Sequence, residues 1–142
     1  MWKSILLICV LCPLIVSSHS CDGCDDYKEV DVSDENVKKI ANELFQAFSD
    51  HFYGAYRWKI DSITKAEEAK CSNEECGKAS SYRIQVVAII TNCLKKEVSY
   101  KDADDCEQKE GTANYYCKLT QTRNKDGHEI YNGASCSRKD ID

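Results

Sequence analysis

Several residue types are scarce in this sequence, and each shortage excludes a kind of protein. Histidine occurs three times in 142 residues, and His19 falls in the leader segment described below, which leaves His51 and His128. Neither lies near a nucleophile pattern, so we expect neither a hydrolytic triad nor a multi-histidine metal site. No Asn-x-Ser/Thr sequence occurs, so N-glycosylation is not expected. The sequence also has no internal repeat, and its single proline, Pro13, lies in the same leader.

Residues 1–20 are typical of a targeting segment. Lys3 precedes an almost wholly apolar run over residues 5–16, and the Ser-His-Ser at 18–20 resembles a small-x-small cleavage site. The apolar run is shorter than the ~20 residues that a membrane-spanning helix needs. We therefore predict a secretory signal peptide at 1–20 and one domain at 21–142, which would be secreted to the extracellular space.

The remaining domain is moderately acidic. The full chain has a formal net charge of −5, and the leader contains one lysine and no acidic residue, so its removal makes the balance more negative. A domain of this charge is expected to be soluble and has no feature that favours nucleic acid or an anionic membrane as a partner.

Cysteine is frequent for a chain of this size, and it indicates the compartment. Of the ten cysteines, eight remain after the leader: Cys21, Cys24, Cys71, Cys76, Cys93, Cys106, Cys117 and Cys136. An even number in a small secreted domain predicts a disulfide framework, although spacing alone leaves the pairing open.

Two other uses of the cysteines are less favoured. A thiol redox centre at Cys21-Asp-Gly-Cys24 is disfavoured because the neighbouring aspartates oppose a thiolate. An all-thiolate zinc site from Cys21, Cys24, Cys71 and Cys76 is permitted by sulfur count, but secretion favours disulfides. We therefore predict no metal and no cofactor.

The strongest helical pattern covers residues 33–52. Its apolar residues recur at steps of three and four and form one stripe: Val37, Ile40, Ala41, Leu44, Phe45, Phe48 and Phe52. Ser33 is placed as an N-cap, and Gly54 follows the end of the pattern. Because one amphipathic helix cannot bury its own stripe, the rest of the domain must cover it.

The remainder predicts an extended arm and a run of antiparallel strands. Alternating or apolar patterns predict strands at 55–63, 82–93, 115–122 and 128–136, the first with a bulge near Ile63. Residues 65–81 hold almost no large apolar residue and predict a long hairpin connection, and residues 94–111 predict a charged loop. The order predicts an α+β layer with a four- to five-stranded antiparallel sheet wrapped around one long helix.

These residues resemble the secreted (type 2) cystatins. The similarity is carried by YRIQVVAIITNC at 82–93, NYYCKLT around Cys117 and IYNGASC ending at Cys136. The resemblance implies disulfides Cys93–Cys106 and Cys117–Cys136, and a five-stranded sheet curled around the helix. It also implies inhibition of papain-like cysteine proteases by three segments that enter the active-site cleft, without any catalysis by the inhibitor.

The three segments can be assigned by that resemblance, but their usual motifs are missing. The arm glycine corresponds to Gly23. The first hairpin tip corresponds to Glu75, Cys76, Gly77, Lys78 and Ala79, in place of Gln-x-Val-x-Gly. The second corresponds to Asn124, Lys125, Asp126 and Gly127, in place of Pro-Trp. A further family motif, the Ser-Asn-Asp that traps legumain, is absent near residues 52–54.

The four cysteines outside the family pattern suggest a second hypothesis. Cys21 and Cys24 lie on the arm, and Cys71 and Cys76 lie near the first tip, so extra disulfides tie arm to tip, or Cys71–Cys76 closes the tip alone. Either arrangement stiffens the end that would meet a protease. We therefore carry two functions for this non-enzymatic protein: a cysteine endopeptidase inhibitor, or a cystatin-fold module that binds another extracellular protein.

Overall fold

The computed structural model describes residues 24, 26–73, 77–124 and 126–138, which form one α-helix and five strands. The elements are β1 (Lys28–Glu29), α1 (Glu35–His51), β2 (Tyr56–Asn73), β3 (Gly77–Leu94), the 3-10 helix η1 (Tyr100–Asp105), β4 (Tyr115–Arg123) and β5 (Glu129–Ser137). The predicted α+β class is confirmed. Among these residues, no helix has the length and apolar character needed to cross a bilayer.

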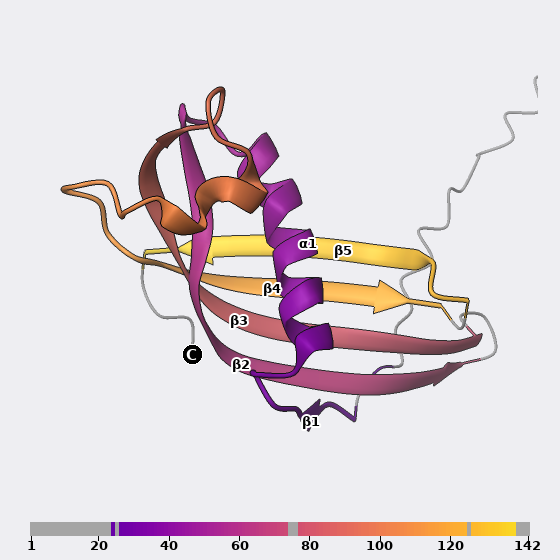
Figure 1. The fold of residues 1–142 in the computed structure, drawn as a ribbon. Helices are drawn as coiled ribbons and strands as arrows, with labels where there is room; N and C mark the ends of the chain where they lie inside the picture. The colour runs from indigo at the N-terminus through magenta and orange to yellow at the C-terminus, as the bar shows by residue number, and fades with distance from the viewer. Residues whose placement is uncertain (1–23, 25, 74–76, 125, 139–142) are drawn as a thin grey trace, which may run out of the picture.

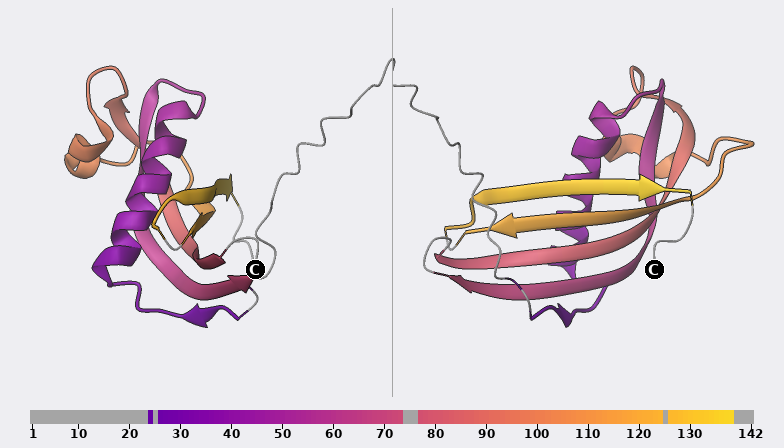
Figure 2. Two further views of the ribbon diagram at one scale, coloured as in Figure 1. Left: turned by 90° about the vertical axis from the view of Figure 1, so that its right-hand side faces the viewer. Right: turned by 180° about the vertical axis from the view of Figure 1, so that it is seen from behind.

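The five strands form one antiparallel sheet that curls around the helix. Each strand pairs with the next along the chain, in the order β1-β2-β3-β4-β5. The register between β2 and β3 shifts at three places, including one between Ile63 and Lys65, as the sequence predicts. Such bulges bend a strand and increase its twist, and Figures 1 and 2 show the sheet curving across one side of α1.

The N-cap of α1 lies one residue later than the sequence predicts. Asp34, not Ser33, is the N-cap, and its carboxylate accepts hydrogen bonds from the backbone N–H groups of Asn36 and Val37. The hydroxyl of Ser33 instead donates to Asp31 at 2.7 Å. Both residue types can cap a helix, so the sequence pattern placed the helix correctly and misjudged its first residue.

The apolar stripe of α1 is buried against the concave face of the sheet. Its buried members are Val37, Ile40, Ala41, Leu44 and Phe45, which join Trp58, Ala66, Ile84, Val86, Ala88, Cys117 and Leu119 in one core cluster. The last residue of the predicted stripe, Phe52, is 40 % exposed because it lies beyond the end of the helix. The stripe therefore forms the core as predicted, except at its final position.

The predicted connection at 65–81 is wrong, because most of it is strand. β2 continues to Asn73 and β3 begins at Gly77, with Ala69 opposite Ser81 and Cys71 opposite Ala79. A small separate core of Cys24, Ala69, Cys71 and Ala79 lies here. Small side chains suffice to fill this narrow core, so the lack of large apolar residues did not indicate a loop.

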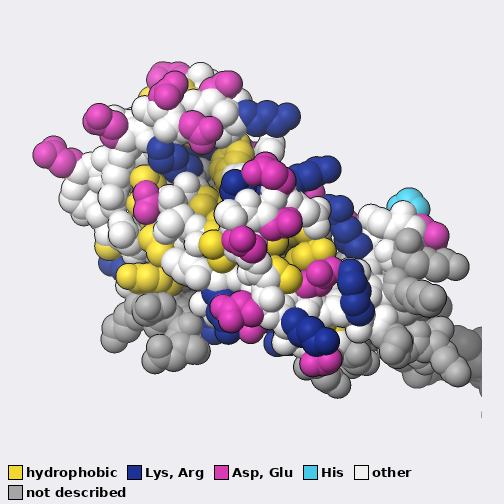
Figure 3. Space-filling view, turned by 60° about the horizontal axis from the view of Figure 1, so that its bottom comes forward, with side chains coloured by type: hydrophobic (Ala, Val, Ile, Leu, Met, Phe, Trp, Pro, Cys, Tyr) yellow, Lys and Arg dark blue, Asp and Glu magenta, His cyan; other side chains and the backbone are white. Residues whose placement is uncertain are grey.

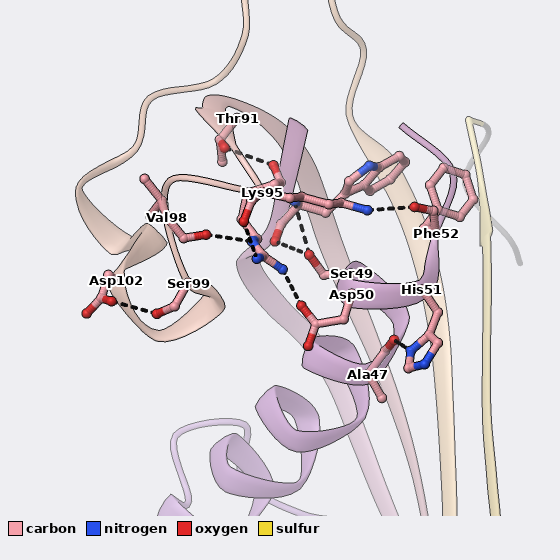
Figure 4. Close-up of polar contacts among 12 residues, drawn as sticks. Ala47, Ser49, Asp50, His51, Phe52, Thr91, Lys95, Val98, Ser99 and Asp102 are labelled. Atoms are coloured by element: carbon pink, nitrogen blue, oxygen red, sulfur yellow. Dashed lines mark hydrogen bonds and ion pairs between the residues drawn. The ribbon is translucent and has the colours of Figure 1, made fainter. Parts of the chain in front are cut away.

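The buried Arg57 joins the end of α1 to the start of β2, and Figure 4 labels its partners Asp50, Val98 and Lys95. The guanidinium of Arg57 is paired with the carboxylate of Asp50 and donates to the backbone carbonyls of Val98 and Lys95 at 3.1 and 3.2 Å. Its own carbonyl accepts a hydrogen bond from the hydroxyl of Thr91 at 2.8 Å. Because the partners of Arg57 come from α1, β3 and the segment after β3, this one residue, through its side chain and its carbonyl, fixes the end of the molecule that carries η1.

Tyr82 gives a testable pH dependence. Its hydroxyl donates to Glu68 at 2.8 Å and accepts from the side-chain amide of Asn36 at 3.2 Å. Burial and the hydrogen bond to Glu68 together raise the pKa of Tyr82 to about 12. Between pH ~10, where an unfolded tyrosine titrates, and the folded pKa, the unfolded chain loses a proton that the folded chain keeps.

Stability is therefore expected to fall as the pH rises through this window, and Tyr82→Phe should reduce the fall. The measurement is the free energy of unfolding in urea for both proteins, at several pH values from about 9 to 12. Equal losses in the two proteins would show that Tyr82 does not keep its proton in the folded state.

Candidate functional site

Three segments that are far apart in the sequence meet at one end of the sheet. The end of β2, the start of β3, the end of β4 and the start of β5 all lie there, because the strands are antiparallel. The arm before β1 reaches the same end, where Cys24 is bonded to Cys71. Figures 1 and 2 show the ends of β2 and β4 and the starts of β3 and β5 on the same side of the molecule, and we call this the three-segment end.

The arm is fixed to the sheet by three kinds of contact. The Cys24–Cys71 disulfide joins it to β2, and the backbone N–H of Val30 donates to the carbonyl of Ala66 at 3.0 Å. Between them, Tyr27 packs against the small core of the hairpin, and the guanidinium carbon of Arg83 lies 3.7 Å from the centre of its ring. The arm is therefore held in place on the sheet before any partner binds.

A chain of hydroxyl groups crosses the sheet beneath the arm. The hydroxyl of Tyr27 donates to Ser81 on β3 at 2.9 Å, and the oxygen of Ser81 lies 3.0 Å from that of Thr122 on β4. Ser81 is 1 % exposed and Thr122 is 7 % exposed, so these hydrogen bonds are shielded from water. They tie the arm to both hairpins, and buried hydrogen bonds of this kind favour one arrangement of the segments.

The first hairpin projects beyond the second. β3 pairs with β4 only from Ser80 onward, whereas β2 and β3 remain paired up to Asn73 and Gly77. Of the predicted tip, Gly77, Lys78 and Ala79 lie in β3, which corrects their assignment to the turn. The predicted tip residues Glu75 and Cys76, with Gly23 of the arm, lie outside the described residues.

The second hairpin turn is held by its own first residue. The side-chain oxygen of Asn124 accepts hydrogen bonds from the backbone N–H groups of Asp126 and His128, at 3.0 and 2.9 Å. Gly127 has a φ of +80°, the left-handed conformation that an Asp-Gly hairpin signal predicts. Asp126, Gly127 and His128 are exposed, while Lys125 lies outside the described residues. The turn therefore presents polar groups on a preformed backbone.

Part of the acidic character of this end is offset by neighbouring lysines. Glu67 is paired with Lys65 at 2.8 Å, and Glu68 is paired with Lys70 and also accepts from Tyr82. Burial opposes the charge on Glu68, yet its two hydrogen bonds outweigh that effect and lower its pKa. Figure 3 shows Lys/Arg and Asp/Glu side chains interspersed on the face that carries the arm and β2. Glu67 and Glu68 are thus both bound into ion pairs.

The disulfides match the implied pairing and decide between the open alternatives. Cys93–Cys106 and Cys117–Cys136 are present as the resemblance implies. Cys24–Cys71 ties the arm to the hairpin, so the alternative in which Cys71 and Cys76 close the tip is wrong. The same bond contradicts a Cys21/Cys24 redox pair and a zinc site that uses both Cys24 and Cys71. Cys21 and Cys76 lie outside the described residues.

The sequence pattern did not single out Tyr27 or Arg83, although both hold the arm in place. Tyr27 stands alone among polar residues, and Arg83 points outward from a strand whose apolar alternation drew attention to its other face. The contact between the two residues can be predicted only if one knows which face of β3 the arm crosses. A solitary aromatic residue in a polar arm was the one available signal.

Comparisons with known proteins show the fold. No protein-family model matches the chain, and a search of characterised protein sequences finds no match. Dimeric human cystatin F is similar in structure, with 16% identity and a TM-score of 0.62, over 90% of this chain and 97% of that chain. A salivary cystatin from the soft tick Ornithodoros moubata has 13% identity and a TM-score of 0.57, over 79% of this chain and 96% of that one.

A third similar structure shows how far the likeness extends. Mouse fetuin-B, solved in complex with crayfish astacin, is 17% identical with a TM-score of 0.60. The match covers 79% of this chain and 34% of that chain, so only part of that protein is compared. At these identities, the comparisons establish a cystatin-like fold.

Proposed function

We propose that this protein is a secreted inhibitor of papain-like cysteine endopeptidases, which blocks the active-site cleft with its three-segment end. The observation that supports this most directly is the meeting of the arm and both hairpin turns at one end of the sheet. The protein would act by excluding substrate, and no catalytic step is assigned to it.

The fixed arm should increase the affinity of the three-segment end for a protease. A segment that is ordered before binding does not pay its ordering entropy on binding, so more of the contact energy remains as affinity. Tyr27 and the Cys24–Cys71 disulfide supply this order. The three disulfides of the described residues also support an extracellular location, since such bonds persist in oxidising compartments.

A second candidate function is a binding module for another extracellular protein. It is favoured by the hairpin that projects past β4 and by the polar second turn at Asn124, Asp126 and Gly127. An apolar turn gains affinity when it is buried in a protease cleft. Exposed polar groups instead need hydrogen-bonding partners in the cleft to avoid a desolvation cost.

A titration of papain with the oxidised protein separates the two functions. Tight, reversible inhibition that competes with substrate supports the inhibitor, and replacing Asp126 by tryptophan should then strengthen it because an apolar ring would fill the cleft. Lys96→Trp, at an exposed position away from this end, is the control and should leave inhibition unchanged. Absence of inhibition by the folded protein at micromolar concentration would reject the first function and favour the second.

A further inference from the structure

A groove between α1 and β5 has no part in the proposed inhibition. Its volume is about 290 Å³, and it is lined by Glu43, Leu44, Ala47, Phe48, Gln121, Glu129, Asn132, Gly133 and Ala134. One wall is the apolar side of the C-terminal half of α1, and the opposite wall is β5. The size suits one large side chain rather than a small-molecule cofactor.

One buried polar atom of a groove residue has no hydrogen-bond partner in the described part of the chain. Gln121 is 0 % exposed, and its side-chain N–H₂ donates to Glu129 at 3.3 Å, while its side-chain oxygen has no partner among the described residues. Reversing the amide would turn its oxygen toward the carboxylate of Glu129, which is unfavourable, so the free atom is the acceptor. A buried acceptor without a donor is costly, and a ligand that brings a donor would relieve that cost.

The charges at the mouth of the groove favour a cation. Two carboxylates lie there, and Arg123 binds both, with its guanidinium 2.9 Å from Glu43 and 3.5 Å from Glu129. The largely exposed Lys39 also approaches Glu43, at 3.9 Å, a separation at which a surface pair is weak. Glu129 also accepts from the side-chain amides of Asn132, at 2.6 Å, and Gln121, but both of these donors are neutral. Two carboxylates therefore share one close guanidinium, and the unpaired side-chain oxygen of Gln121 is another acceptor. An aliphatic side chain that ends in a cation fits both the apolar walls and these acceptors.

The groove runs beside an unpaired strand edge. β5 is the last strand of the sheet, and among the described residues no strand pairs with its outer edge. Between Glu129 and Arg138 the strand sequence has no charge and no proline, the two features that usually protect an edge. An exposed edge of this kind can hydrogen-bond an added strand.

The position of α1 limits what can occupy that edge. The C-terminal turns of α1 extend past β5, so they overhang the place where a sixth strand would lie (Figures 1 and 2). A second copy that paired through β5 would bring its own α1 to the same face of the joined sheet, where the first α1 already lies. A single extended segment brings no such helix, so this arrangement favours it over a second copy.

We propose that the α1–β5 groove is a peptide-binding site, which adds an extended segment of a partner protein to β5 and takes a lysine or arginine side chain from it. The backbone of the segment pairs with β5, and the aliphatic part of the basic side chain packs on Leu44 and Phe48. Its charged end lies between the side-chain oxygen of Gln121 and the carboxylate of Glu129. Neither contact uses the arm or the two hairpin turns.

The probe is a fluorescent seven-residue peptide of alternating threonine and valine with lysine at the centre, and binding is followed by fluorescence anisotropy. Replacing the central lysine by norleucine keeps the aliphatic stem and removes the charge, and should weaken binding by about tenfold or more. Binding of the lysine peptide should also weaken as the salt concentration rises. Equal affinities for the lysine and norleucine peptides, or no binding of the lysine peptide up to about 1 mM, would overturn the proposal.

Two substitutions on β5 provide a matched pair. Ala134→Arg places a cation at the groove, and should weaken binding of the lysine peptide by about tenfold or more. Ser135→Arg adds the same charge at the next exposed residue, which faces the other side of the sheet, and should change binding less than about twofold. Equal loss in both variants, or no loss in Ala134→Arg, would reject the groove. Inhibition of papain should be the same in both variants and the parent, so the two proposals can fail separately.

Discussion

Replacing Cys24 and Cys71 together by alanine is expected to lower the free energy of unfolding by on the order of 4 kcal/mol. The bond closes a loop of 47 residues, and its loss restores that freedom to the unfolded chain. It is also the contact that fixes the beginning of the described arm. Equilibrium unfolding in urea measures the loss, and amide hydrogen exchange at Val30, which donates to Ala66, measures local opening of the arm.

The matched control is the double substitution of Cys93 and Cys106 by alanine. That bond closes 13 residues, so the expected loss is smaller, on the order of 3 kcal/mol, and the exchange rate at Val30 relative to global unfolding should not change. If the arm stayed protected in the Cys24/Cys71 variant, Tyr27 and the β1 pairing alone would hold it. In that case the disulfide would not be the contact that orders the arm at the three-segment end.

The fold was largely predictable because its signals are local and periodic. The three- and four-residue spacing of the helix stripe and the alternation along β3 and β4 are direct consequences of element geometry. The failure at residues 65–81 has a different cause. Ala69 and Ala79 are as fully buried as large core residues. The small core that they form with the Cys24–Cys71 disulfide contains no large apolar side chain, so a hydropathy pattern does not reveal it.

The resemblance to the cystatins predicted that the arm and the two hairpins lie together, but not how they contact one another. It placed these segments at one end of an antiparallel sheet, and the Asp-Gly signal located the turn after Asn124. The contacts between them were not predictable, since Tyr27, Ser81 and Thr122 are distant in sequence and meet only through the strand register. The free oxygen of Gln121 is likewise invisible in the sequence, because a glutamine in a strand is usually exposed.

Phe45→Ala is expected to cost about 3–5 kcal/mol of unfolding free energy, since it would leave a large cavity at the centre of the core. Phe45 is 0 % exposed, and its ring centre lies 5.3 Å from that of Phe48 and 6.3 Å from that of Tyr100, the first residue of η1. The loss would therefore act on two contacts at once, the packing of α1 on the sheet and the seating of η1 on α1. The measurement is equilibrium unfolding in urea. The slope of the unfolding free energy against urea concentration should be unchanged, so that the shift in midpoint reports the loss of stability.

Phe52→Ala is the control, because it removes the same ring at the end of the same stripe. Phe52 is 40 % exposed and lies after the helix, so its loss should cost roughly 1 kcal/mol, mainly through its contacts with Phe48 and Trp58. Equal costs for the two variants would contradict the burial of the helix stripe in the curve of the sheet. A large loss at Phe45 with a small one at Phe52 means that the sheet packs tightly on the middle of α1 and only loosely on the residues that follow it.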